Sequence, residues 1–154
     1  MEYKTLALES FFIVGVSVRT TNANNKAQQD IGALWDRIFT EDWASKIPIK
    51  LSGDIYSTYL DYEKDYTAPY TYVLGFKVPD LENIPAGFEG FTIAAAKYHV
   101  YTVKGKIPQC IHEGWMHIWH NEANRSYKAD FEIFDEKAQN PENAEVSIYI
   151  AQND

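Results

Sequence analysis

Histidines and carboxylates on one predicted helix are the residues whose types first suggest chemistry. His112-Glu113 begins like the helical motif of zinc proteases, but His117 follows His112 by five positions rather than the four that place both rings on one face. Glu113, His117 and His120 do share a helical face, yet the sequence shows no fourth ligand and no group that would orient them. We therefore predict a solvated helix face, with no metal and no cofactor.

The chain carries none of the short motifs that mark common catalytic centres. It has no glycine-rich phosphate loop, no nucleophile elbow and no cysteine–histidine signature of a thiol catalyst. Its one cysteine, Cys110, cannot form an internal disulfide, so we expect a small core residue in a protein of the reducing cytoplasm. These observations leave enzymatic activity open and favour a protein that is not an enzyme.

Aromatic side chains and acidic charge distinguish the composition. Aromatics make up 15% of the 154 residues, with 11 Tyr, 8 Phe and 4 Trp, and such rings serve either strand packing or a flat binding surface. The formal net charge of −8 disfavours direct binding to nucleic acid and weakly attracts cations, although it also serves solubility. No stretch approaches the roughly 18 apolar residues of a membrane span, so we expect no membrane partner.

Hydrophobic patterning divides the chain into two similar halves. Helices are predicted over residues 27–39 and 107–120, where apolar residues recur at helical spacing. Apolar or alternating runs predict strands over residues 11–18, 55–62, 70–78, 91–103, 130–136 and 146–151. The order strand, helix, strand, strand occurs twice, at a period of roughly 75 to 80 residues.

This order predicts one α+β domain over residues 1–154, with internal repeats at about 1–79 and 88–154. The turn-rich stretch 79–87 separates the repeats. Two such halves would pack about a pseudo-two-fold axis. The place where they meet is a natural position for a ligand groove.

Several motifs resemble those of the GyrI-like small-molecule-binding family. The most specific ones are Lys97-Tyr98-His99-Val100-Tyr101, Trp115-x-x-Ile118-Trp119, Phe131-Glu132-x-Phe134 and the closing Val146-Ser147-Ile148-Tyr149-Ile150. This family includes the effector-binding domains of MerR-type and AraC-type multidrug regulators, and stand-alone integron-encoded proteins. Two features depart from its pattern. Asn121-Glu122-Ala123-Asn124 replaces a proline-rich turn, and no helix-turn-helix domain fits before Phe11, so we expect a sensor alone.

The resemblance implies duplicated modules with an antiparallel sheet, two main helices and an aromatic groove centred on an acidic residue. It assigns the acidic role to Glu132, which alternation places on the same strand face as Phe134. From the residues alone, a strand carboxylate facing water is the simpler interpretation of Glu132, and core packing is the simpler one for the tryptophans. The ligand-binding residues expected from the resemblance are Glu132, Trp119, Tyr72, Tyr149, Tyr56, Phe134 and Trp35.

A carboxylate among rings in a half-closed groove is partly desolvated, which opposes its charged form. A bound cation would restore the charge and gain cation–π attraction of roughly 0.5–2 kcal/mol per ring. We therefore expect a stand-alone protein that senses or sequesters a lipophilic, cationic small molecule. Two alternatives stay open: hydrolysis of strained cyclopropane-containing compounds with Glu132 as general base, which the resemblance also implies, and inhibition of an unknown protein partner.

Overall fold

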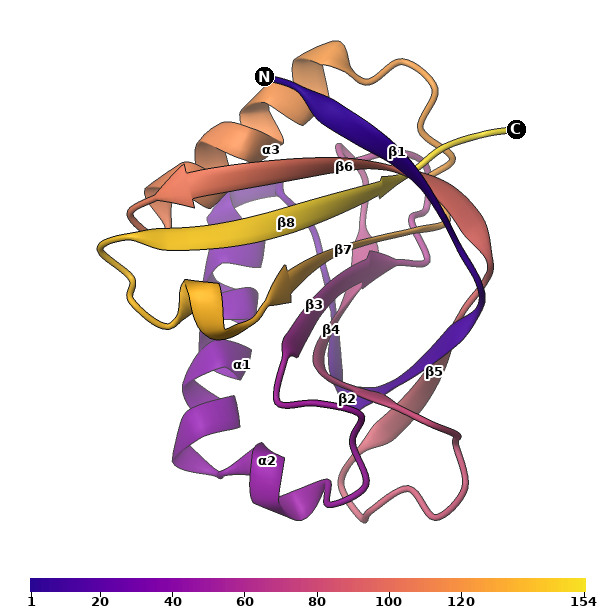
Figure 1. Cartoon of the computed structure of the whole chain (residues 1–154), viewed down its shortest axis with the longest axis vertical. Coiled ribbons are helices and arrows are strands. Elements are labelled where there is room, and N and C mark those ends of the chain that lie inside the picture. Colours follow the sequence, from indigo (N-terminus) through magenta and orange to yellow (C-terminus); the bar gives the residue numbers. More distant parts are fainter.

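The computed structural model describes residues 1–154 and consists of one antiparallel sheet with helices on one side (Figure 1). The strands are β1 (Tyr3–Leu8), β2 (Phe11–Thr20), β3 (Ile55–Leu60), β4 (Tyr70–Val78), β5 (Glu89–Ile93), β6 (Ala96–Gly105), β7 (Ala129–Phe134) and β8 (Ala144–Ala151). The helices are α1 (Lys26–Thr40), α2 (Trp43–Lys46) and α3 (Gln109–Asn121), with short 3-10 turns η1 (Ala23–Asn25) and η2 (Glu136–Ala138). None of the helices is long and apolar enough to span a bilayer.

The strand order β1-β6-β8-β7-β3-β4-β2-β5 shows the duplication directly. The modules β2-α1-β3-β4 and β6-α3-β7-β8 each contribute three neighbouring strands, and their strands β3 and β7 pair at the centre, with Ser57 opposite Glu132. Each module is preceded by a strand that pairs with the other module, since β1 joins β6 and β5 joins β2. The predicted α+β fold of duplicated modules is therefore confirmed.

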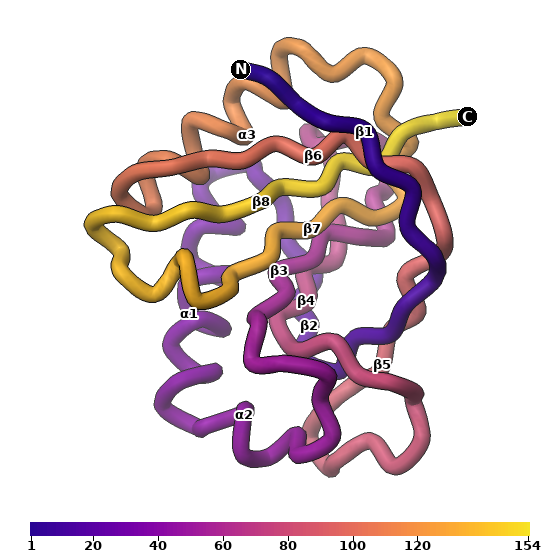
Figure 2. The backbone as a smooth tube through the Cα atoms, viewed as in Figure 1, coloured from indigo at the N-terminus to yellow at the C-terminus, as the bar shows by residue number.

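Short connections force the sheet to curl. Only Glu9 and Ser10 separate β1, which lies at one edge of the strand order, from β2, which lies next to the other edge. Because the three Cα–Cα steps from Leu8 to Phe11 span at most about 11 Å, the two ends of the sheet must approach each other. Figure 2 shows this course of the chain from β1 around to β2.

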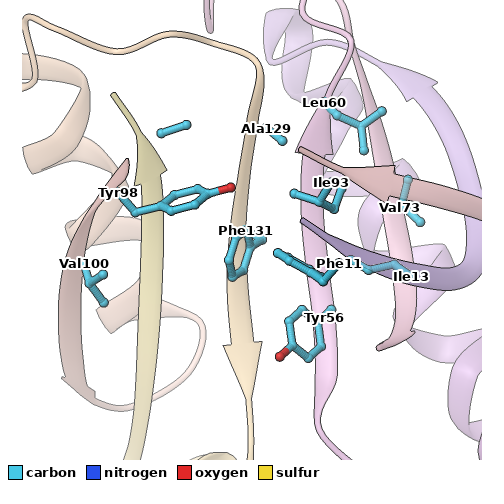
Figure 3. Packing of buried hydrophobic residues seen from close by; sticks show 11 residues of the cluster. Phe11, Ile13, Tyr56, Leu60, Val73, Ile93, Tyr98, Val100, Ala129 and Phe131 are labelled. Carbon is cyan, nitrogen blue, oxygen red and sulfur yellow. The ribbon is translucent and has the colours of Figure 1, made fainter. Parts of the chain in front are cut away.

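Alternation along the strands divides the core between the two faces of the sheet. One face packs against α1 and α2 through residues such as Leu34 and Leu74, and against α3 through residues such as Ile118 and Ile148. The other face carries no helix and fills the inside of the curl with its own side chains, including Phe11 and Phe131 (Figure 3).

Several elements differ from the sequence-based prediction, and three of the differences concern strands at or near the centre and edges of the sheet. The strand predicted over residues 55–62 ends at Leu60, because Asp61 adopts a left-handed backbone conformation with φ of 50°. The strand predicted over residues 91–103 is two strands, β5 and β6, which pair with opposite ends of the sheet. Strand β1 was not predicted, because its side chains lie exposed at a sheet edge and show no buried face.

Two glycines allow β2 and β4 to approach closely at the middle of the first module. Gly15 and Gly75 lie opposite each other in the β2–β4 register. A Cβ atom on Gly75 would lie 2.1 Å from the Val14 carbonyl oxygen, and one on Gly15 would lie 2.1 Å from the Leu74 carbonyl oxygen. These contacts are with backbone, so a side chain at either position would push the two strands apart.

We predict that Gly75→Ala lowers the free energy of unfolding by roughly 1–3 kcal/mol, the usual cost of overpacking a well-packed site. Gly53→Ala is the matched control, because a Cβ atom there would meet nothing within 4 Å. Urea unfolding followed by tryptophan fluorescence measures both variants. Equal stability of Gly75→Ala and the unmodified protein would contradict the close approach of β2 and β4.

Candidate functional site

A cavity of about 640 Å³ lies between the two main helices and the centre of the sheet. In Figure 1 both helices lie on the same side of the sheet, α1 beside the first module and α3 beside the second. Helix α1 contributes Ile31 and Trp35, and helix α3 contributes Ile111, Trp115 and Trp119. The sheet and loops contribute Ser57, Tyr59, Tyr62, Tyr66, Tyr70, Arg125, Glu132 and Phe134. We call this space the α1–α3 cavity.

Glu132 lies at the floor of the α1–α3 cavity and is only 2% exposed. Its Oε1 atom accepts a hydrogen bond of 3.2 Å from the Tyr59 hydroxyl, and its Oε2 atom accepts one of 2.6 Å from Trp115 Nε1. Glu132 belongs to none of the ion pairs in the structure. The carboxyl group is therefore oriented by neutral donors and has no protein counter-charge.

Burial raises the pKa of Glu132 above its ordinary value, because the charged form loses its hydration. Hydrogen bonds from Trp115, Ser57 and Tyr59 act in the opposite direction, since they stabilise the carboxylate, but they do not outweigh burial. The site thus presents a carboxyl group whose charged form is disfavoured by burial and which ionises more readily beside a positive charge.

A second buried carboxylate, Asp130, lies two residues before Glu132 on β7 and is already paired. Arg125 Nη2 donates to Asp130 Oδ2 at 2.7 Å, and the two side chains are 1% and 0% exposed. The Tyr62 hydroxyl and the Ala151 amide also donate to Asp130, both at 2.8 Å. Burial opposes the charge on Arg125, but Asp130, Tyr62 and Tyr127 together outweigh burial and raise the Arg125 pKa. This pair balances its own charges and leaves Glu132 as the uncompensated group of the cavity.

Aromatic rings form the walls around Glu132, and contacts among them fix their orientation. Tyr59 lies edge-to-face with Trp115, with ring centroids 5.0 Å apart. Tyr66 stacks on Trp119 at 5.3 Å with an interplanar angle of 10°. Trp35 lies edge-to-face with Phe134 at 4.7 Å. The cavity therefore offers preformed flat surfaces around one carboxyl group.

The structure places four of the seven expected ligand-binding residues in this cavity. Glu132, Trp119, Phe134 and Trp35 line it directly. Tyr72 is 0% exposed and lies beneath the lining, where its hydroxyl accepts a hydrogen bond of 3.0 Å from Trp35 Nε1 and bonds Ser57 Oγ at 2.6 Å. Tyr72 therefore fixes the position of Trp35 and does not face the cavity.

Tyr56 and Tyr149 lie on the opposite face of the sheet, away from Glu132. Tyr56 alternates with Ser57 and Tyr59 along β3, and Tyr149 alternates with Ile148 and Ile150 along β8. Neighbouring residues of a strand point to opposite faces, so Tyr56 cannot share a face with Ser57, and Tyr149 cannot share the face of Ile148, which packs with Trp115. The expectation that one groove collects all seven residues is therefore corrected.

Sequence reasoning missed several lining residues, including Ser57, Tyr59, Trp115 and Arg125. A signal for Ser57 and Tyr59 existed, since both alternate with Tyr56 and belong to the strand that pairs with the one carrying Glu132. No local signal marks Arg125, because it lies in an irregular segment and reaches the cavity only through the tertiary fold.

Comparison with known proteins identifies the family of the chain. Residues 6–151 match the family model of Cass2, the integron-associated effector binding protein. The chain belongs to this family. YobU of Bacillus subtilis (strain 168) is 30% identical over 142 residues, which cover 89% of this chain and 89% of YobU. The resemblance read from the sequence motifs is thereby confirmed.

Two solved structures of similar proteins share the fold. SAV2435, solved bound to tetraphenylphosphonium, aligns with a TM-score of 0.81 and 23% identity, covering 99% of this chain and 94% of that one. The integron cassette protein VCH_CASS2, from the mobile metagenome of Vibrio cholerae, aligns with a TM-score of 0.77 and 22% identity, covering 99% and 96%. At these identities the likeness shows the fold that the two proteins and this effector-binding protein have in common.

The unpaired state of Glu132 predicts how stability responds to its replacement. A folded-state pKa above the unfolded value means that the protonated acid stabilises the fold, and this contribution is lost as the pH rises through the folded-state pKa. Glu132→Gln should therefore raise the free energy of unfolding at neutral pH, and the gain should vanish in acid. Denaturant unfolding at several pH values measures it.

Asp130→Asn is the matched comparison, because it removes the carboxylate that does have a partner. It should lower the free energy of unfolding by roughly 3–5 kcal/mol, since it leaves Arg125 buried without its counter-charge. Destabilisation of both variants at neutral pH would contradict the distinction between the two carboxylates.

Proposed function

We propose that this protein binds lipophilic organic cations in the α1–α3 cavity, with the Glu132 carboxylate as their counter-charge. The observation that carries the proposal is a carboxyl group that is 2% exposed, surrounded by aromatic rings and absent from every ion pair of the protein. A buried charge without a partner costs several kcal/mol even after relaxation, so about that much is available to a ligand that supplies the opposite charge.

The rings around Glu132 favour the same class of ligand. A flat or propeller-shaped aromatic cation would replace water against Tyr59, Trp115 and Trp119, and each ring face would add roughly 0.5–2 kcal/mol of cation–π attraction. The cavity volume of about 640 Å³ lies within the range of drug-sized ligand pockets. Neutral aromatic compounds would gain the stacking but not the charge compensation, so they should bind more weakly.

The comparison with SAV2435 supports this ligand class. That protein has been solved bound to tetraphenylphosphonium, a permanently charged lipophilic cation, and its fold is the fold of this chain. Tetraphenylphosphonium keeps its positive charge at every pH. Any dependence of its affinity on pH therefore comes from a titrating group of the protein. We infer that this chain senses or sequesters compounds of this kind.

We predict that tetraphenylphosphonium binds the protein with a Kd below about 100 μM, whereas neutral triphenylphosphine oxide binds at least about tenfold more weakly. Glu132→Gln should abolish most of the difference between the two ligands, because it keeps the shape of the side chain and removes the charge. Isothermal titration calorimetry measures all four combinations.

Glu113→Gln serves as the control for long-range charge. Glu113 is exposed on α3 and does not line the cavity, so this variant should retain the preference for the cation. Equal loss of preference in both variants would assign the effect to net charge rather than to Glu132. Turnover of a strained cyclopropane compound, lost in Glu132→Gln, would assign the carboxyl group to hydrolysis instead.

The raised pKa of Glu132 predicts that cation binding depends on pH. A bound cation stabilises the carboxylate and lowers the Glu132 pKa, so binding should release a proton, and affinity should fall as the pH drops through the pKa of the free protein. Calorimetric titrations in two buffers of different ionisation enthalpy count the proton released. A constant affinity for tetraphenylphosphonium between pH 4 and pH 8 would contradict a role for Glu132.

A further inference from the structure

A second cavity, of about 520 Å³, lies on the opposite face of the sheet from Glu132. It opens where the chain crosses from β1 to β2, and its wall includes Leu8, Phe11, Tyr56, Lys77, Phe131 and Tyr149. We call it the β1–β2 cavity. Strand β7 contributes to both cavities. Phe131 and Glu132 are neighbours on this strand and point to opposite faces of the sheet.

Aromatic rings line the β1–β2 cavity, as they line the first one. Phe131 and Tyr149 stack with ring centroids 4.5 Å apart and an interplanar angle of 12°. Phe11 contacts Phe131 at 5.3 Å and Tyr56 at 5.9 Å. Figure 3 shows Phe11, Tyr56 and Phe131 next to one another inside the curl of the sheet. The wall is therefore suited to a flat aromatic ligand.

Three side chains of this cavity, those of Lys77, Tyr56 and Tyr149, can donate hydrogen bonds to a ligand. The Lys77 ammonium lies 5.1 Å from the centre of the Phe11 ring and takes part in no ion pair. The hydroxyls of Tyr56 and Tyr149 make no hydrogen bond within the protein and are not occluded. Burial raises the pKa of Tyr56 to about 12, so its hydroxyl stays a donor at neutral pH.

Three carboxylates near this cavity do not pair with Lys77. Glu9 belongs to the lining but is exposed to water and makes no ion pair with Lys77. Asp54 raises the pKa of Tyr56 and Asp135 raises the pKa of Tyr149, but neither carboxylate belongs to the lining. More distant carboxylates of this acidic chain are screened at physiological salt, where the Debye length is about 8 Å.

We propose that the β1–β2 cavity is a second ligand site, which takes a small aromatic carboxylate with Lys77 as its counter-charge. The ring of the ligand packs against the Phe131–Tyr149 stack and Phe11. Its carboxylate accepts from the Lys77 ammonium and from the free tyrosine hydroxyls. The protein then holds two sites of opposite charge preference on the two faces of one sheet.

Titration with 1-naphthoate tests the site, with 1-naphthamide as the neutral ligand of the same shape. Naphthoate should bind the unmodified protein with a Kd below about 1 mM and more tightly than the amide. Lys77→Gln should weaken naphthoate roughly fivefold to tenfold and leave the amide unchanged. Lys97→Gln is the matched control, because Lys97 is exposed, forms no ion pair and lines neither cavity.

Tyr149→Phe removes one hydroxyl without changing the ring, and it should also lower the affinity for naphthoate. This variant tests the site if Lys77→Gln fails to fold. Saturating tetraphenylphosphonium and the Glu132→Gln variant should leave naphthoate binding unchanged, which separates this site from the α1–α3 cavity. Absence of naphthoate binding, equal binding of acid and amide, insensitivity to both Lys77→Gln and Tyr149→Phe, or displacement by tetraphenylphosphonium would each overturn the proposal.

Discussion

The organisation of the site depends on one buried carboxyl group that lacks a counter-charge. Glu132 accepts hydrogen bonds from Tyr59 and Trp115, and these orient the group without neutralising it. Burial makes its ionisation costly in the empty protein, and the same burial makes a nearby positive charge valuable. This balance is the basis of our proposal that the site binds ligands that are both apolar and cationic, because an apolar cation loses little hydration on entering the cavity and supplies the missing charge.

The duplicated fold explains why the carboxyl group is sheltered. Strands β3 and β7 pair where the two modules meet, so Glu132 of one module lies opposite Ser57 of the other. Each module also brings one helix, and α1 and α3 flank this central pair of strands with Trp35, Trp115 and Trp119. Neither half could enclose the carboxyl group alone, because one wall would be missing. The Arg125–Asp130 pair differs from Glu132, because the protein itself supplies both charges of the pair. No unpaired charge is left there for a ligand.

Sequence patterns were sufficient to predict the fold, whereas the position of Glu132 in the cavity was expected only from the family resemblance. Helical spacing around Trp35 and Trp115 and the repeated order of strands reflect which faces are buried, and burial is what sequence periodicity records. The position of Glu132 followed from its alternation with Phe131 together with the family motif. Trp119, Trp35 and Phe134 reached the cavity for the same reason, since each shares a helix or strand face with the groove.

The rest of the site depends on features that periodicity does not record. Tyr56 and Tyr149 were assigned to the groove by residue type, whereas strand parity sends them to the far face. Tyr62 reaches the α1–α3 cavity only because Asp61 turns the chain with a positive φ, and nothing in the sequence around Asp61 demands that conformation. Arg125 and Tyr66 enter from irregular segments, where contacts between distant parts of the chain decide the direction of a side chain.

Measuring the pKa of Glu132 tests most directly whether burial disfavours its charge and whether a bound cation restores it. Carbon NMR of the glutamate carboxyl groups, titrated with and without saturating tetraphenylphosphonium, follows this residue individually, and Glu132→Gln identifies its signal. We expect a pKa above the ordinary glutamate value in the free protein and a clear decrease when the cation is bound. An ordinary pKa in the free protein that does not change with the ligand would contradict Glu132 as the counter-charge of the site.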